Sequence, residues 1–299
     1  MKRTMPFHAI LFFTGLCFAF IGCNRSEPPS PPSPAAQPEA PAEQQATPSE
    51  RKEAVAAPHD LQESVDALIH AVETLDIAKV LEGYADDFTS GTGRSKDGVR
   101  EVFTNLQKSH VSIKVESAEI EETDADKAKL KTRVRLRYMD TFRDLGEGEV
   151  LVTDTLRHSL RKEGNQWKIY ADERIATYRE GRFGEQSPNA QLEVPEKLPT
   201  EANYTVTVAV QREEGKNYQV LVGNYPEDPA FLPPPDIVTM LPENGILTAN
   251  LLRNPPGHNE MVRITVITED PEGKWLGATT ISKFISGVGK GSTEEQEVI

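Results

Sequence analysis

The sequence predicts an α+β fold followed by a small all-β domain, and three observations support this. A period of 3.6 residues runs through residues 60–109, where three helices are expected. A period of two follows, most regularly over Ala128–Tyr138, where apolar or small residues alternate with lysines and arginines. From residue 203 onward, short apolar runs between turn residues replace the helical period. The helices should therefore pack on one side of an antiparallel sheet.

The predicted helices each have a start signal. The first begins at Asp60 and places Leu61 and Val65 on its apolar stripe. Asp76 should cap a second helix over residues 77–88, and Ser95 or Asp97 should start a third that ends near residue 109. Four strands should then form a meander, over residues 111–121, 128–142, 149–161 and 166–173.

The C-terminal part should be a small β-sandwich, because six short strand candidates occur at regular spacing. These lie at residues 205–211, 218–224, 236–241, 245–252, 261–269 and 275–284. The expected organisation is a signal peptide (1–22), a lipidated cysteine with a Pro-rich disordered tether (23–58), an α+β domain (59–180), a linker (181–200), a sandwich (201–286) and a disordered tail (287–299).

The N-terminus has the anatomy of a secretory signal, with a short basic start, an apolar run over residues 7–21 and a small residue before Cys23. The tetrapeptide Phe20-Ile21-Gly22-Cys23 resembles a bacterial lipobox, although leucine is usual at the position of Phe20. This implies a lipoprotein held in the bilayer by acyl chains, such as palmitate, on Cys23. Because Asn24 follows, we expect the outer membrane, facing the periplasm, rather than the inner one. The alternative is an ordinary signal peptide cleaved elsewhere.

Charge and cysteine content exclude several classes of function. The formal net charge of −14 disfavours nucleic acid and anionic lipid head groups as partners. Cys17 would be removed with the signal, so the folded part should contain no cysteine. Thiol chemistry, cysteine zinc sites and iron–sulfur clusters are therefore excluded there. We expect no cofactor and no metal, because Asp86 and Asp87 have no further ligands at a suitable spacing.

Residues 61–174 resemble the nuclear transport factor 2-like superfamily, in its SnoaL-like and ketosteroid isomerase branch. The likeness lies in LDIAKVLEGYADDF, GRSKDGVREVFTNL and DTLRHSLRKEGNQWKIYADE. It implies a cone-shaped half-barrel, with three helices on a curved antiparallel sheet and a cavity between them, and it allows a homodimer. The family includes both enzymes and binding domains, so the fold does not choose the function. The isomerase base is not transferable, because the loop Thr89–Gly93 has no carboxylate.

Candidate catalytic residues follow from the period of two in the strand that begins at Glu149. Asp154 and His158 share the face of the core residues and should point into the cavity, where Tyr138 can add a phenol. The alternative is that Asp154 is bonded at an open rim and His158 is a core histidine. Predicted cavity-lining residues are Tyr84, Phe88, Phe103, Leu106 and Trp167.

The cationic row from Lys129 to Arg137 has two interpretations, an anion or partner surface and a solvated, salt-bridged sheet face. For the whole chain, we favour a lipid-anchored envelope protein that binds a small apolar ligand or an envelope protein without catalysis. The alternative is an isomerase, cyclase or dehydratase acting on a small hydrophobic substrate in the cavity.

Overall fold

The computed structural model describes residues 59–195, 197–198, 203–226, 234–253 and 259–287. Cys23, the predicted signal peptide and tether, and the predicted tail beyond residue 287 lie outside the described residues. The helical elements are α1 (His59–Glu73), α2 (Ile77–Glu82), α3 (Lys96–Lys108) and the 3-10 turn η1 (Arg143–Leu145). Within the described ranges, no helix has the length and hydropathy needed to cross a membrane.

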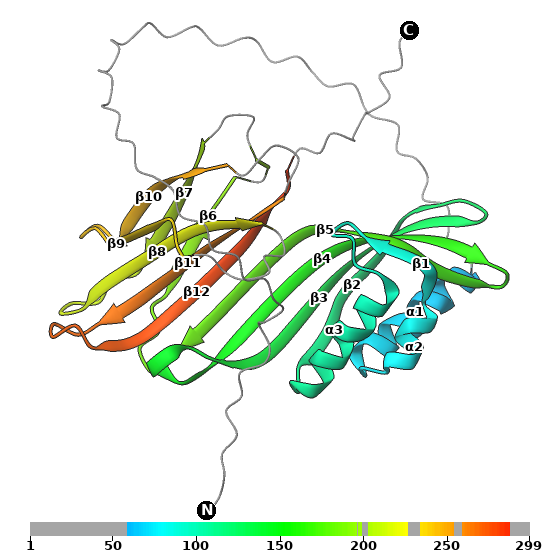
Figure 1. Cartoon of the computed structure of the whole chain (residues 1–299), viewed down its shortest axis with the longest axis horizontal. Helices are drawn as coiled ribbons and strands as arrows, with labels where there is room; N and C mark the ends of the chain where they lie inside the picture. Colours follow the sequence, from blue (N-terminus) through cyan, green and yellow to red (C-terminus); the bar gives the residue numbers. More distant parts are fainter. Residues whose placement is uncertain (1–58, 196, 199–202, 227–233, 254–258, 288–299) are drawn as a thin grey trace, which may run out of the picture.

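Most of the described chain is β-structure. The strands are β1 (Tyr84–Ser90), β2 (Ser112–Thr123), β3 (Lys127–Thr141), β4 (Glu147–Glu163), β5 (Gln166–Phe183), β6 (Ala190–Glu193), β7 (Asn203–Val210), β8 (Asn217–Pro226), β9 (Ile237–Met240), β10 (Ile246–Leu252), β11 (Glu260–Glu269) and β12 (Trp275–Ile285). A large sheet has the order β2-β3-β4-β5-β12-β11-β8-β9, with β1 also beside β5, and a small sheet has the order β10-β7-β6. Figure 1 shows the large sheet running the length of the molecule, with the helices at one end.

Strand β5 joins the two halves of this sheet. One edge pairs with β4 along nearly its whole length. The other edge pairs in parallel with β1 near its start, and in antiparallel with β12 over Tyr178–Phe183. The predicted α+β and β-sandwich parts therefore share one continuous hydrogen-bonded sheet.

The N-terminal half has its core between the helices and the large sheet. Leu61 and Val65 of α1 and Val80 of α2 are buried against Leu130 of β3 and Ile169 of β5. The alternation predicted for β3 explains this, because it places Leu130 on the dry face and the cations on the other. The cap predicted at Asp76 is confirmed, and of the two predicted starts of the third helix, Ser95 and Asp97, Ser95 is the cap of α3.

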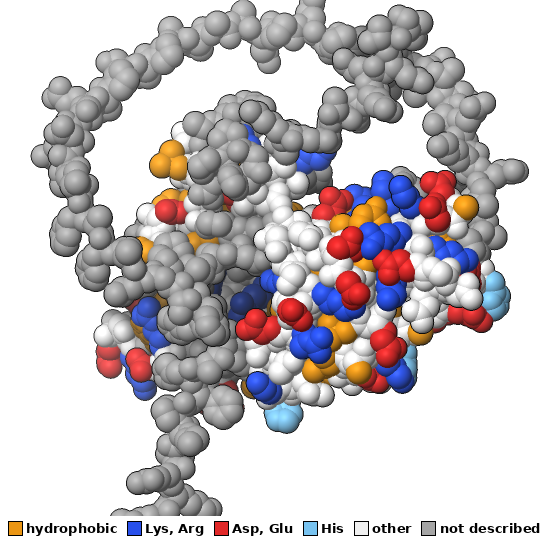
Figure 2. Space-filling view, turned by 45° about the vertical axis from the view of Figure 1, so that its right-hand side comes forward, with side chains coloured by type: hydrophobic (Ala, Val, Ile, Leu, Met, Phe, Trp, Pro, Cys, Tyr) orange, Lys and Arg blue, Asp and Glu red, His pale blue; other side chains and the backbone are white. Residues whose placement is uncertain are grey.

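The three arginines in the cationic row of β3 form ion pairs with glutamates on neighbouring strands. Arg133 and Arg135 both pair with Glu116, and Arg137 pairs with Glu149. Figure 2 shows cationic and anionic side chains interspersed on the visible surface of the half that contains the helices. This arrangement fits a solvated sheet face, where exposed pairs contribute about 0–1 kcal/mol each.

The second core lies between the small sheet and the C-terminal part of the large one. Val206 and Val208 of β7 pack in one cluster with Val220 of β8, Ile264 of β11 and Ile281 of β12, all of them fully or almost fully buried. The six strands predicted in this region are present as β7 to β12, with ends within two residues of those expected.

The second helix is shorter than predicted. It ends at Glu82 rather than at residue 88, and Tyr84–Ser90 forms β1 instead. Gly83 closes the helix, and its carbonyl accepts a 2.8 Å hydrogen bond from the backbone N–H of Ile169. The segment pairs with the free edge of β5 although its apolar residues have helical spacing. Hydrogen bonding to a distant strand outweighs the weak local preference for a helix.

The segment predicted as a linker (181–200) carries ordered structure. Gly181 and Phe183 belong to β5, and Ala190–Glu193 forms β6, which pairs with β7. The intervening backbone packs on β12, where an added Cβ at Gly277 would come within 2.3 Å of Gln186. The local sequence pattern does not predict this strand, since β6 has only four residues and gains its stability from pairing and burial.

Candidate functional site

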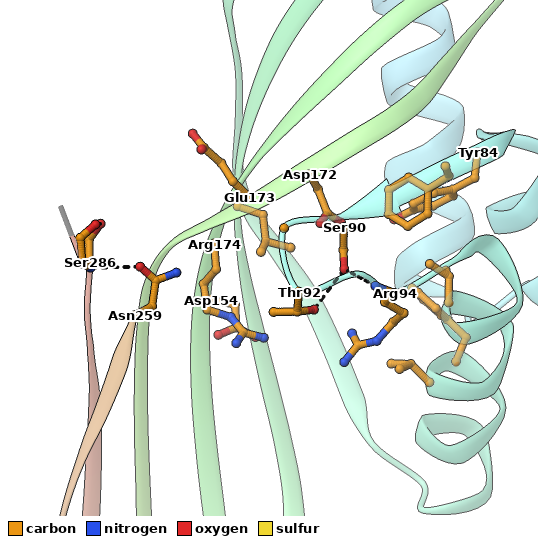
Figure 3. Close-up of a pocket in the computed structure, with 17 residues that line it drawn as sticks. Tyr84, Ser90, Thr92, Arg94, Asp154, Asp172, Glu173, Arg174, Asn259 and Ser286 are labelled. Carbon is orange, nitrogen blue, oxygen red and sulfur yellow. Dashed lines mark hydrogen bonds between the residues drawn. The ribbon is translucent and has the colours of Figure 1, made fainter. Parts of the chain in front are cut away.

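A pocket of about 560 Å³ lies between the β1–α3 loop, α3 and the face of the large sheet. One wall is apolar and includes Phe88, Val99 and Phe103. Close by, the lining is polar and carries the charged residues shown in Figure 3, namely Arg94, Asp154, Asp172, Glu173 and Arg174. A concave site with an apolar wall and a few polar groups is typical of small-molecule binding.

The β1–α3 loop is held by its own hydrogen bonds. The Ser90 hydroxyl accepts from the backbone N–H of Arg94 at 2.8 Å and lies 3.0 Å from the Thr92 hydroxyl (Figure 3). The N–H of Gly91 donates to the carbonyl of Asp172 at 2.7 Å, which ties the loop to β5. Arg94 therefore extends from a braced loop, opposite Arg174 on the sheet.

Asp154 lies in the pocket, as predicted from the alternation in β4. Its Oδ1 accepts a 2.6 Å hydrogen bond from the Thr177 hydroxyl on β5, directly across the ladder. This contact restrains the carboxylate while it remains half-buried at the pocket surface. Asp154 can therefore receive a hydrogen bond from a ligand.

His158 is not in the pocket lining. It is 6 % exposed, and its Nε2 lies 2.9 Å from the Thr132 hydroxyl on β3. Nδ1 has no hydrogen-bond partner among the described residues. Burial lowers the pKa of His158 to about 4, so the imidazole is neutral at neutral pH. The structure thus places His158 in the core, and the predicted meeting of Asp154 and His158 in one cavity does not occur.

The predicted lining residues divide into two groups. Tyr84, Phe88 and Phe103 line the pocket, and the Tyr84 and Phe88 rings meet edge to face at 4.7 Å. Leu106 is half-buried on α3 outside the lining, and Trp167 is 4 % exposed in the helix–sheet core. Trp167 therefore fills the interior instead of facing a ligand, and Leu106 does not contribute to the lining.

Tyr138 also lies away from this pocket, in a cluster with Leu136 and Phe142 at the other end of the sheet. Burial raises its pKa, and the Arg179 guanidinium sits 5.8 Å above its ring. By contrast, Tyr84 is in the pocket, where burial and the nearby Asp172 raise its pKa while Arg94 opposes them. The phenol in this site is therefore Tyr84 and not Tyr138.

The sequence patterns did not identify four charged residues of the pocket, Arg94, Asp172, Glu173 and Arg174. Arg94 belongs to a loop, and the three others lie where β5 departs from regular pairing with β4. A strict period of two cannot assign a face across such a shift. In the part of the chain that the structure describes, there is no group of three metal-ligating side chains.

The buried His158 predicts a pH-dependent stability. Its folded-state pKa of about 4 lies below the unfolded value of about 6.5, so the unfolded chain binds more protons between these limits. The free energy of unfolding should therefore fall as the pH drops through this range. We expect His158 to account for a loss of about 2 kcal/mol between pH 7 and pH 5. Urea denaturation at pH 7 and pH 5 measures the loss.

His158→Gln should show a smaller loss between these pH values, whereas His70→Gln, which changes an exposed histidine, should behave as the wild type. An equal loss in wild type and His158→Gln would contradict a neutral, buried imidazole.

The solved structures that resemble this protein match only part of the chain. No family model matches the sequence, and no curated protein does. A nuclear transport factor 2-like protein of unknown function from Shewanella oneidensis is 17% identical, covers 38% of this chain and 95% of that one, and has a TM-score of 0.30. LinA is 15% identical, covers 38% and 82%, and has a TM-score of 0.31. A protein of unknown function with a cystatin-like fold from Nostoc punctiforme is 15% identical, covers 38% and 86%, and has a TM-score of 0.29.

Proposed function

We propose that this protein is a lipid-anchored component of the bacterial cell envelope that binds a small ligand without catalysis. The observation that carries the proposal is the composition of the pocket. It combines an apolar wall with Asp154, while His158 lies outside it, bonded to Thr132. A carboxylate without an imidazole partner favours binding over general acid–base chemistry.

The ligand in this proposal is amphiphilic. Its apolar part packs on Phe88, Val99 and Phe103, and its polar part meets Arg94 and Arg174. A guanidinium donates in a planar fork, and it can add a ligand oxygen to the bonds that it already makes. The pocket volume of about 560 Å³ suits a small molecule.

The fold part of the proposal is a cone-shaped half-barrel of the nuclear transport factor 2-like superfamily, made by the helices with β1 to β5, and a β-sandwich made by β6 to β12. It is supported by the residues that carry the resemblance in 61–174, by the helices packed on one face of the sheet, and by the core between the two sheets. A homodimer is part of the same family expectation.

The envelope location is supported by the sequence before the described residues. The apolar run over 7–21 and the tetrapeptide ending at Cys23 favour export and lipidation, and Asn24 favours the outer membrane. The Pro-rich residues 24–58 would then hold the folded part away from the bilayer.

Native mass spectrometry of the protein purified from its own host tests the binding role. We expect an extra mass that disappears when the same sample is denatured. Val102→Trp should abolish the extra mass, because Val102 lines the pocket and a larger side chain fills it. Val238→Trp, at a position 56% exposed on edge strand β9, is the matched control and should retain it. A bare mass in the wild type would overturn ligand binding and favour a protein partner.

An enzyme remains the second candidate, because Asp154 and Tyr84 line the same pocket. In that case Asp154 is the base and the Tyr84 phenol stabilises the developing charge. Asp154→Asn should then co-purify with unreacted substrate, because it cannot turn the substrate over. The wild type should co-purify with a chemically different compound, the product. The same compound in both proteins would support binding alone.

A further inference from the structure

A second pocket, of about 410 Å³, lies on the far half of the large sheet. Arg263, Thr265 and Ile267 of β11 face it, and the intervening residues of that strand belong to the core beneath the small sheet. This pocket is therefore on the face of the sheet opposite β6, β7 and β10. Among the residues that the structure describes, the two pockets have no lining residue in common.

The walls of the second pocket are rich in aromatic and apolar groups. Phe142, at the start of the β3–β4 connection, and Trp275 of β12 place their ring centroids 6.4 Å apart at an angle of 43°. Tyr225 and Leu221 of β8 add to the lining. Such walls suit a planar apolar body.

The charge in this pocket has one sign. Arg143 and Arg263 are the charged residues of its described lining, and none of the described lining residues is acidic. The Arg143 guanidinium sits 5.7 Å from the centre of the Trp275 ring. Two cations without a lining carboxylate are unusual in a chain with a net charge of −14.

Arg263 is the central group. It is half-buried, and its guanidinium makes no hydrogen bond or ion pair with any residue that the structure describes. Burial and the neighbouring Arg179 both lower the pKa of Arg263, and the nearby Asp140 raises it. The Asp140 carboxylate, however, pairs with the Arg179 guanidinium at 3.4 Å. Arginine stays protonated in proteins, so this site holds a cation that lacks a hydrogen-bonded counter-charge. Burying a charge is costly unless it is paired.

We propose that the second pocket binds a small organic anion, with a carboxylate or phosphate group on Arg263 and a planar apolar body against Phe142, Trp275 and Tyr225. Guanidinium geometry matches both anionic groups through paired N–H donors. Arg143, whose guanidinium lies beside the Trp275 ring, adds a second positive charge to the pocket wall. This inference is independent of what the first pocket binds.

Isothermal titration of the full-length protein with 1-naphthoate and with 1-naphthyl phosphate tests the proposal. We expect saturable binding of at least one, and the stronger of the two identifies the anionic group. The neutral 1-naphthalenemethanol should bind at least about tenfold more weakly, because it lacks the charge. Inorganic phosphate should also bind more weakly, because it lacks the apolar body.

Arg263→Gln should weaken the naphthyl anion about tenfold or more. The matched control is Lys283→Gln, which removes one positive charge from β12 opposite Val262, on the other face of the same sheet. It should leave the affinity unchanged. Arg143→Gln is a second variant at the site, and circular dichroism checks that each variant is folded.

Failure of both naphthyl anions to bind the wild type would overturn the proposal. So would equal affinity for the neutral alcohol, or for inorganic phosphate. Loss of binding in Arg94→Gln with retention in Arg263→Gln would assign the ligand to the first pocket and equally refute a second site.

Discussion

Replacing Cys23 with serine is expected to move the protein from the membrane fraction to the soluble fraction and to abolish incorporation of labelled palmitate. The reason is that acyl chains on the cysteine sulfur contribute about 0.8 kcal/mol per buried CH₂, and two or more chains anchor a protein stably. Serine has no thiol to carry the thioether. Fractionation of cells followed by detection of the protein in each fraction measures the effect.

The matched control is Cys17→Ser, because Cys17 lies within the predicted signal peptide. This variant should be labelled and membrane-bound like the wild type. If Cys23→Ser stays in the membrane fraction with the signal correctly processed, the protein is not a lipoprotein, and the ordinary signal peptide would be the correct interpretation.

Truncating Ile281 to alanine should lower the free energy of unfolding by about 2–5 kcal/mol. Ile281 is 1 % exposed on β12, in the core beneath the small sheet, and its removed methyl groups would leave a cavity. Because Ile281 also pairs with Glu180 of β5, the loss should extend to the N-terminal half. Urea denaturation, followed by tryptophan fluorescence, measures the change.

The two tryptophans allow each half to be followed separately. Trp167 lies in the helix–sheet core, and Trp275 lies on β12. In Trp275→Phe and Trp167→Phe backgrounds, Ile281→Ala should shift both transitions together. Val238→Ala, at an exposed position, should shift neither by more than about 0.5 kcal/mol. A shift confined to the Trp275 signal would show that the halves unfold independently, despite their shared sheet.

The candidate site was only partly predictable from the sequence. Asp154 and Phe103 were identified, because alternation and helical spacing assign faces while an element is regular. Tyr84 and Phe88 were also identified although their segment is a strand, because residues four apart share a face in a helix and in a strand alike. His158 shares that alternation with Asp154, yet the sheet and helices bury it. Residues missed in the first pocket come from a loop and from an irregular part of β5, where periodicity carries no information about direction.

The second pocket could not have been found from sequence patterns. Its residues come from the β3–β4 connection, β8, β11 and β12, which are far apart in the chain. Phe142 and Trp275 were assigned to different domains, and only the continuous sheet brings their rings together.

By itself, the sequence determined the local elements of this protein. Helix caps at Asp76 and Ser95, the alternation of β3 and the six C-terminal strands depend on neighbouring residues, so they could be read directly. Only the tertiary structure decided which edges pair. The free edges of β5 and β7 turned Tyr84–Ser90 and Ala190–Glu193 into strands, and β5 joined β12. The physical reason is that backbone hydrogen bonds between distant segments form wherever an edge is exposed, and no local period encodes that partner.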